Sequence, residues 1–224
     1  MTRRSLREDK AAAPPASQAS QADQKPLSTR QVQAMHTRQR LLEAGYAVFL
    51  EQGFQKATIA QIIKKAETGY GTAYVYFQNK DELFVEVMED VMERFYEVAE
   101  YPFFPETKEE AYELIAHQVG RFLELAQMNR EIMRVVKEGI GTSPLVEERW
   151  RRIRERFIER IAQDIRYSQG KGLARRDLDA LLVARGWFYA NEMFMWYMVE
   201  AEEPPPLEEI VKNLTGLYTG GLYL

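Results

Sequence analysis

The 224-residue chain contains no cysteine and only two histidines, His36 and His117. Without thiols it can form neither disulfides nor thiolate metal sites. Glu113 precedes His117 by four residues, a spacing that on a helix is more typical of a surface contact than of a metal site. We therefore expect no bound metal and no cofactor.

Long apolar runs are also missing. The longest, Met193–Val199, spans seven residues, whereas a membrane-spanning helix needs roughly 18 or more. No apolar segment follows the N-terminal arginines, so the start of the chain does not have the form of a signal peptide. Phosphate loops and nucleophile–base arrangements are absent too. We expect a soluble cytoplasmic protein that is not an enzyme and has no catalytic residues.

Aromatic residues are missing from the first 27 positions, which are rich in alanine, proline, serine and glutamine. Such a composition cannot bury enough apolar surface to fold. We therefore expect a disordered, basic N-terminal arm over residues 1–34. Two interpretations of this arm stay open: contact with phosphates or a minor groove of nucleic acid, or a passive tail.

Negative charge is scarce in the first 80 residues, where 12 Lys and Arg stand against 6 Asp and Glu, a net charge of +6. The remaining residues hold 18 against 28, a net charge of −10. The overall net charge of −4 therefore combines a basic N-terminal part with an acidic remainder. A basic N-terminal part indicates a polyanionic partner such as nucleic acid, although a solvated basic tail would give the same count.

No segment alternates with the two-residue period of a strand, and the chain shows no repeat. From residue 80 onward apolar residues recur at helical spacing, with breaks at segments that contain Pro or Gly. We expect helices over residues 80–100, 107–127, 129–139, 144–169, 177–200 and 206–219. The sequence therefore predicts an all-α fold.

Residues 58–77 have the form of a short helix, a tight turn and a second short helix. Thr58 and Gln61 match a capping box at the start of the first. Helix fails near Gly69, and the second helix is expected to continue to about Phe77 in spite of its small residues.

Cap signals also bracket this unit. Ser28 starts a longer upstream helix, which Gly53 is expected to end. Asn79, with Glu82 three residues later, starts the helix that follows. Three helices with a tight turn between the second and third make a helix-turn-helix unit.

The run from Thr37 to Leu83 resembles the DNA-binding domain of TetR-type transcriptional regulators. The residues that carry the resemblance are Arg38, Leu41-Leu42-Glu43-Ala44, Val48-Phe49, Gly53-Phe54, Thr58-Ile59, Ile62, Ala66, Gly71-Thr72, Tyr74, Phe77, Lys80 and Leu83. The resemblance implies an N-terminal three-helix DNA-binding domain over residues 35–95. It also implies a larger helical ligand-binding and dimerisation domain over residues 96–224, which fits the family only in outline.

Four positions depart from the family's pattern. Glu67 stands where a glycine is usual, Gly69-Tyr70 replaces Ser-Lys, and Tyr76 replaces histidine. Because the lysine is lost, a contact of Tyr70 with the operator does not follow from the family.

Carried over residue by residue, the resemblance implies a set of DNA-binding residues. Thr58 and Lys80, each at a helix start, would hold phosphates. Tyr74 and Tyr76 would place hydroxyls on the DNA backbone, with packing against the first helix as the alternative. The residues from Thr68 to Thr72 would face the major groove. The whole set is Arg38, Thr58, Thr68, Gly69, Tyr70, Gly71, Thr72, Tyr74, Tyr76 and Lys80.

The helix over residues 177–200 is apolar on nearly all faces from Trp187 onward. Such a helix must be buried all round, and one domain covers only one of its faces. A second copy of the chain would cover the other, as the last two helices do in TetR-like regulators. A large monomeric core is the alternative. The expected dimer residues are Phe188, Phe194, Trp196, Tyr197, Leu214, Leu217 and Tyr218.

Aromatic and methionine side chains of the second domain are candidates to surround a cavity, because methionine adapts to irregular apolar guests. Plain core packing is the alternative for each of them. Asn191 is more specific, since a buried polar group needs a partner. The candidate ligand-binding residues are Phe122, Leu125, Met128, Met133, Trp150, Phe157, Trp187, Asn191 and Met195.

The sequence as a whole indicates a homodimeric, ligand-responsive DNA-binding regulator. We expect a repressor that binds a palindromic operator in double-stranded DNA and leaves it when a hydrophobic effector, an acyl chain or a drug-like molecule, binds. The alternative is a DNA-binding regulator whose C-terminal domain docks a protein partner and senses no small molecule.

Overall fold

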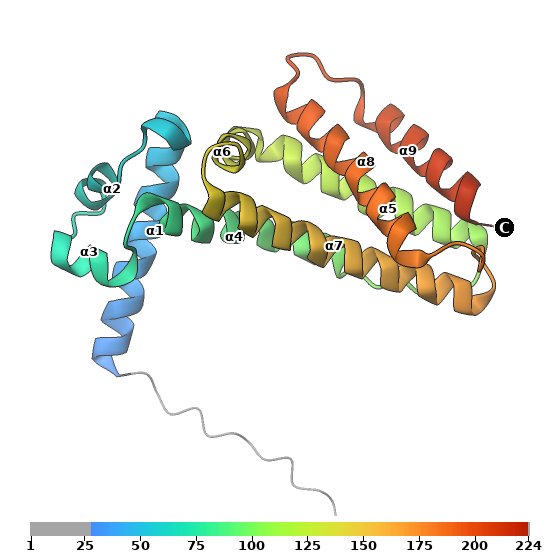
Figure 1. Ribbon diagram of the computed structural model, residues 1–224, viewed down its shortest axis with the longest axis horizontal. Coiled ribbons are helices and arrows are strands. Elements are labelled where there is room, and N and C mark those ends of the chain that lie inside the picture. The colour runs from blue at the N-terminus through green and yellow to red at the C-terminus, as the bar shows by residue number, and fades with distance from the viewer. Residues whose placement is uncertain (1–27, 224) are drawn as a thin grey trace, which may run out of the picture.

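The computed structural model describes residues 28–223, which form nine α-helices (Figure 1). Within this part of the chain no strand is present, apart from an isolated bridge between Ala174 and Tyr223. The predicted all-α fold is therefore confirmed. The helices are α1 (Thr29–Lys56), α2 (Ile59–Lys65), α3 (Tyr70–Tyr76), α4 (Lys80–Ala99), α5 (Lys108–Met128), α6 (Arg130–Ile140), α7 (Pro144–Lys171), α8 (Ala180–Glu200) and α9 (Leu207–Leu222).

The start of α1 corrects the expected N-terminal arm. Residues 1–27 lie outside the described residues, but the last part of the expected arm, residues 29–34, is helical. The Ser28 side chain accepts the N–H of Gln31, and the Gln31 side chain accepts the N–H of Ser28 in return. This capping box satisfies two backbone donors and carries the helix back into the polar segment.

Gly53 changes the direction of α1, as its predicted role as a helix end requires. Its φ of +72° lies in the left-handed region that favours glycine, and one more helical turn follows to Lys56. Gly45, earlier on α1, lets α4 come close, because a Cβ there would lie 2.2 Å from the Leu83 side chain. These two glycines fix how α1 meets the rest of the chain.

The turn between α2 and α3 is a Schellman motif with an unusual residue at its centre. The N–H of Thr68 donates to the Ile63 carbonyl and the N–H of Glu67 donates to the Lys64 carbonyl, the two bonds that define the motif. Glu67 holds the left-handed position with φ of +49°, where glycine is usual. The motif explains why a turn forms here in spite of the departure at Glu67.

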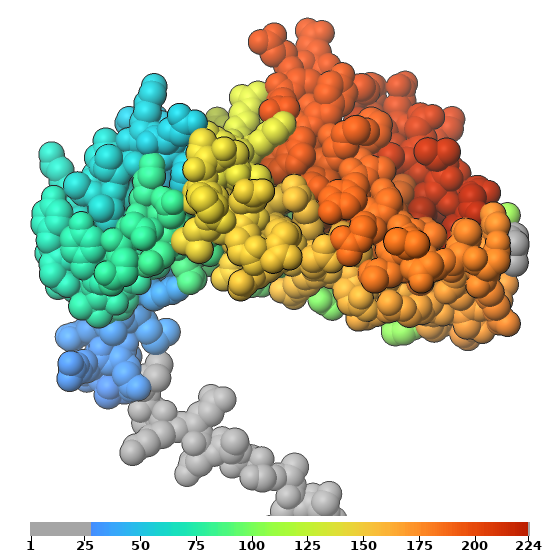
Figure 2. All heavy atoms as spheres, in the orientation of Figure 1, coloured from blue at the N-terminus to red at the C-terminus, as the bar shows by residue number. Residues whose placement is uncertain are grey.

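The C-terminal helices pack around α4. In Figure 1, α4 leads away from the helix-turn-helix unit behind α7, and α8 and α9 lie above α7. Helix α7 packs on α4 and α8, and α5 packs on α8 and α9. Figure 2 shows the helix-turn-helix unit, blue to green, as a lobe beside these helices, with the α6–α7 region in yellow between them.

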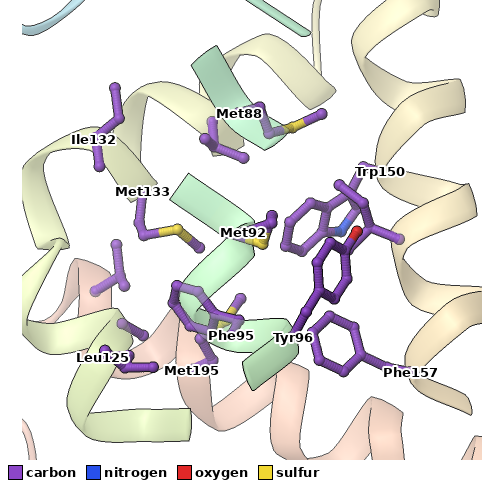
Figure 3. Close-up of a cluster of buried hydrophobic side chains, with 14 of the residues drawn as sticks. Met88, Met92, Phe95, Tyr96, Leu125, Ile132, Met133, Trp150, Phe157 and Met195 are labelled. Atoms are coloured by element: carbon purple, nitrogen blue, oxygen red, sulfur yellow. The ribbon is translucent and has the colours of Figure 1, made fainter. Parts of the chain in front are cut away.

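The core between these helices is rich in methionine and aromatic side chains (Figure 3). Met88, Met92 and Phe95 project from α4 and are almost fully buried. Met133 from α6 and Met195 from α8 meet them there. No helix within residues 28–223 is long and apolar enough to cross a membrane.

We predict that Glu67→Gly raises the free energy of unfolding by about 1 kcal/mol, because a left-handed conformation costs residues with a Cβ roughly that much. Glu67→Gln keeps the Cβ and removes only the charge, so its stability should stay close to that of the natural chain. Chemical denaturation of the three proteins measures the difference. Equal stability of the Gly and Gln variants would show that the turn carries no strain.

Candidate DNA-binding surface and ligand cavity

Helix α3 has the form of a recognition helix because very little of it is buried. Only Ala73 is buried within the helix, with Phe77 buried just after it. Tyr70, Tyr74 and Val75 are exposed, although side chains of these types are usually covered. An exposed helix face with hydroxyl and methyl groups suits the major groove, where hydrogen bonds and methyl contacts distinguish base pairs.

Gly71 lies in the middle of this exposed face. A Cβ at Gly71 would meet no heavy atom within 4 Å, so neither packing nor backbone conformation requires a glycine there. Gly69 is the N-cap of α3, and Thr72 is exposed on the same helix. These predicted residues, with Tyr70 and Tyr74, lie together on one open surface.

Other predicted DNA-binding residues have partners within the chain. Thr58 caps α2 by accepting the N–H of Gln61. The hydroxyl of Thr68 donates to the Ala66 carbonyl, inside the turn. Tyr76 is half-buried at the end of α3. These three residues shape the unit itself.

The two predicted cations are also engaged. Arg38 pairs with Glu86 at 2.7 Å. The ammonium of Lys80 donates to the carbonyl oxygens of Phe54 at 2.7 Å and Gln55 at 3.0 Å. In the free protein, Lys80 therefore fastens the end of α1 to the start of α4.

Three DNA-facing candidates were missed by the sequence interpretation. Val75 is 77% exposed and follows Gly71 by one helical turn, but an apolar residue gives no polar signal. Arg40 reaches the α2–α3 turn, with a guanidinium nitrogen 3.4 Å from the Thr68 hydroxyl. Lys64 is exposed in the last turn of α2. The basic residue next to the turn was the available signal for Lys64, whereas only the fold brings Arg40 of α1 to the turn.

A carboxylate of α6 holds the other side of the α1 joint. Glu138 accepts the backbone N–H groups of Phe54 at 2.8 Å and Gln55 at 3.1 Å. A Cβ at Gly53 would lie 2.9 Å from this carboxylate, so the glycine also makes room for Glu138. A side chain of the C-terminal domain thus binds backbone groups of the helix-turn-helix unit.

A cavity that is partly open to solvent lies in the C-terminal domain among α4, α5, α7, α8 and α9. Its atom-free space is about 680 Å³, including the part that opens to solvent. Eight of its 17 lining residues are aromatic. Among them, Trp187 stacks on Tyr218 with ring centroids 4.1 Å apart, and Phe157 stacks on Phe188 at 5.6 Å. A mostly apolar cavity with a few polar groups is the usual form of a small-molecule site.

Four of the nine candidate ligand-binding residues line this cavity: Phe122, Phe157, Trp187 and Asn191. The other five, Leu125, Met128, Met133, Trp150 and Met195, do not. Met133 and Met195 are packed in the core of Figure 3. Leu125 is buried in the same cluster, and Met128 is exposed at the end of α5. These residue types are common in ligand cavities, but here they lie on parts of their helices that do not face the cavity.

Trp150 belongs instead to a buried polar cluster between α7 and α8. Its indole N–H donates to Glu192 at 2.7 Å, and Arg154 donates to the same carboxylate at 2.8 Å. Glu192 is buried, so these donors replace the water that a carboxylate needs. The cluster fixes the register of the two helices.

The polar part of the cavity is built around Asp164 and Asn191. Burial raises the pKa of the Asp164 carboxyl to about 6, against the opposing effect of Arg160, which donates to it. Burial also raises the pKa of the Tyr218 phenol well above its ordinary value. The cavity therefore disfavours unneutralised charge on its wall.

Four of the seven expected dimer residues point into the chain instead. Phe188 and Tyr218 line the cavity, Leu214 is buried, and Trp196 packs on Trp150 with centroids 5.3 Å apart. Tyr197 and Leu217 are exposed, and Phe194 is half-buried beside Leu217. Because α8 is apolar on nearly all faces, its sequence does not show which face is buried within the chain.

The N-terminal and C-terminal parts of the chain each match a family of known proteins. Residues 41–87 match the family model "Bacterial regulatory proteins, tetR family", and residues 115–223 match "Transcriptional regulator EthR, C-terminal domain". The HTH-type transcriptional regulator SrpR of Pseudomonas putida is 28% identical over 148 residues, which cover 66% of this chain and 68% of SrpR.

Solved structures share the fold. A TetR-family regulator from Syntrophomonas wolfei superposes with a TM-score of 0.67 at 20% identity and covers 82% of this chain and 93% of its own. A structure described as an SmeT–triclosan complex gives a TM-score of 0.64 at 19% identity, with 84% and 92% covered. At these identities the likeness shows the fold alone.

We predict that Asp164→Asn stabilises the chain at pH 8 by about 1–2 kcal/mol, because a raised carboxyl pKa means that ionisation opposes folding. The contribution of Asp164 to stability is present below its ordinary pKa near 4 and is lost as pH rises through about 6. The difference between the two proteins should therefore vanish below pH 4. Denaturant titrations from pH 4 to pH 8 measure it.

Glu203→Gln, at an exposed position between α8 and α9, is the matched control for loss of one carboxylate. If Asp164→Asn were less stable than the natural chain at pH 8, the ion pair with Arg160 would outweigh the burial of the carboxyl.

Proposed function

Because the chain belongs to the TetR family of transcriptional regulators, we propose that it binds a palindromic operator as a homodimer. In this proposal it represses transcription and leaves the operator when a hydrophobic small molecule enters the cavity. The observation that carries the proposal is the presence, in one chain, of an exposed helix in the helix-turn-helix unit and a cavity rich in aromatic side chains. Membership of the family supports DNA binding, and the cavity supports the binding of a small molecule.

The open face of α3 is the part that we propose enters the major groove. Tyr70, Gly71, Thr72 and Val75 would lie against base edges, and Tyr74 would reach a phosphate. Arg40 and Lys64 beside the turn would add phosphate contacts. Lys80 would act indirectly, because its ammonium already holds the end of α1.

An apolar stripe on α8 supports the homodimer. Leu182, Tyr189, Met193 and Tyr197 are exposed and recur at helical spacing on one side of the helix. Leu217 on α9 is 81% exposed and lies beside Phe194 of α8. A continuous apolar surface of this kind is typical of a protein interface, and a two-fold partner would present the same surface.

Helix α4 is the element through which we propose that the ligand acts. It begins at the helix-turn-helix unit with Lys80, and its far end lines the cavity with Phe95, Val98 and Ala99. Its 20 residues span about 30 Å. A ligand that prefers the cavity shape of one conformer shifts the spacing of the two recognition helices by its differential affinity.

Two structural neighbours support a lipophilic effector for this proposal. SmeT is described in complex with triclosan, and a Bacillus halodurans neighbour is described as a fatty acid degradation regulator. For this chain the effector class is a proposal that rests on the aromatic wall of the cavity.

The exposed stripe on α8 also fits a second candidate function. In that case the chain is a regulator that docks a protein partner and senses no small molecule. Mass spectrometry of an organic extract of the purified protein separates the two. A co-purified lipophile supports the ligand-responsive regulator. A stoichiometric protein partner in place of a second copy would support the docking function.

We predict that Gly71→Ala raises stability by about 0.5–1 kcal/mol, as alanine does in a helix, yet weakens operator binding about tenfold, because the Cβ keeps the backbone of α3 from the groove. Operator fragments come from genome-wide mapping of the bound sites, and fluorescence anisotropy measures the affinity. Gly170→Ala, at an exposed position of α7 that is equally open, should show the stability gain alone. Unchanged operator affinity for Gly71→Ala would remove α3 from the proposed interface.

We predict that Met193→Glu combined with Leu217→Glu turns the dimer into a monomer, since buried unpaired charges oppose association strongly. Sedimentation of the natural chain should give twice the protomer mass of 26.1 kDa. Met128→Glu, at an exposed methionine on α5, is the matched control and should remain dimeric. A monomeric natural chain, or a dimeric double variant, would contradict the interface.

A further inference from the structure

The side chains of α3 differ from those that usually recognise bases through hydrogen bonds. The helix has the sequence YGTAYVY, which contains no arginine, lysine, asparagine, glutamine, aspartate or glutamate. Those are the side chains that pair with guanine, adenine and cytosine in the major groove, several of them with two hydrogen bonds at once. Helix α3 offers hydroxyl and methyl groups instead.

Methyl groups lie on the side of α3 that faces away from the protein. Ala73 is buried, and Gly71 and Val75, two positions before and after it, lie on the opposite side of the helix. Val75 is 77% exposed, and Thr72, three residues earlier, is exposed as well. Because Gly71 has no Cβ, the helix backbone can approach a surface closely, and the methyl groups of Thr72 and Val75 would then contact that surface.

Two side chains beside α3 that could pair with bases already have partners within the chain. The Gln78 amide donates to the Tyr74 carbonyl at 2.6 Å. The Arg40 guanidinium lies 3.4 Å from the Thr68 hydroxyl. Direct recognition of bases by α3 therefore depends on the hydroxyl and methyl groups of the helix itself.

The exposed methyl groups of Thr72 and Val75 match one group in the major groove, the C5 methyl of thymine. Contact between such groups removes apolar surface of both partners from water. Against cytosine or guanine, the same valine would cover an amino group or an oxygen without replacing its hydrogen bonds to water, which is unfavourable. The methyl groups of α3 therefore favour thymine over these bases.

We propose that α3 recognises thymine through its C5 methyl group, with Val75 and Thr72 as the specificity-determining residues. Each half-site of the operator then carries at least one thymine whose methyl group packs against these two side chains. This inference rests on the proposed binding of a palindromic operator and names the base that α3 selects.

Replacement of thymidine by deoxyuridine tests the proposal, because uracil lacks the methyl group and pairs with adenine in the same way. Each thymine of the mapped operator is replaced in both half-sites at once, and fluorescence anisotropy measures the affinity of the full-length protein without effector. One lost methyl contact lowers affinity about fourfold, so its loss in both half-sites should weaken binding about fifteenfold. At least one thymine position should show this loss, and thymines outside the half-sites should show none.

Val75→Ala and Thr72→Ser remove methyl groups from the protein side of the contact. In the double variant, uracil at the sensitive position should change the affinity less than about twofold, because its methyl partner is gone. Tyr70→Phe removes a hydroxyl and keeps both methyl-bearing side chains, so this matched control should keep the full loss. A loss that persists undiminished in the double variant would overturn the assignment to Val75 and Thr72.

A base pair with 5-methylcytosine separates recognition of the methyl group from recognition of DNA shape. Cytosine in place of the sensitive thymine removes the methyl group and the A·T pair together, whereas 5-methylcytosine restores the methyl group alone. Binding should therefore be about fifteenfold tighter with 5-methylcytosine than with cytosine in both half-sites. Equal binding of the two would show that the shape of the A·T pair is what the protein recognises, and would contradict the proposal.

The outcomes separate this inference from the function on which it rests. An operator that is bound specifically and is insensitive to uracil at every thymine overturns the inference and leaves the proposed DNA-binding function intact. Genome-wide mapping that yields no bound site overturns the proposed function, and this inference with it.

Discussion

Two charged side chains hold the backbone of Phe54 and Gln55 from opposite sides, and the position of the helix-turn-helix unit depends on them. Lys80 of α4 binds the two carbonyl oxygens, while Glu138 of α6 binds the two N–H groups. Gly53 makes both possible, because its positive φ turns the chain and its missing Cβ leaves room for the carboxylate. The joint therefore consists of backbone groups held by α4 on one side and by α6 of the larger domain on the other, and a relative movement of α4 and α6 must move it.

Local signals in the sequence were enough to place most helix ends, and they failed where tertiary contacts decide. Thr58 with Gln61 and Asn79 with Glu82 mark helix starts because the capping group lies within three residues of its partner. Burial of the aromatic residues followed from their composition. The helix face that meets the cavity did not, since Trp150 was assigned to the cavity and is held by Glu192 of α8 instead.

The same limit explains the dimer residues. Phe188 and Tyr197 are both aromatic residues of α8, and nothing in the sequence separates the inward face from the outward one. Only the stacking of Phe188 on Phe157 of α7 makes that choice. The turn at Glu67 is a further case, because a left-handed glutamate is recognised from its φ and from the Schellman bonds, and not from its residue type.

The methionine cluster of Figure 3 lies between the cavity and the joint, and its chemistry suits that position. Met88 precedes Phe95, the first α4 residue of the cavity wall, by about two turns, and Met92 precedes it by about one turn. Methionine is unbranched and repacks with little loss of contact, so α4 can shift against α6 and α8 without opening voids. At its other end α4 is held rigidly by Lys80 and by Asp81, which accepts the Ser143 hydroxyl at 2.7 Å. Under the proposed mechanism, α4 would therefore carry a displacement that begins at the cavity to the joint and, through it, to α3.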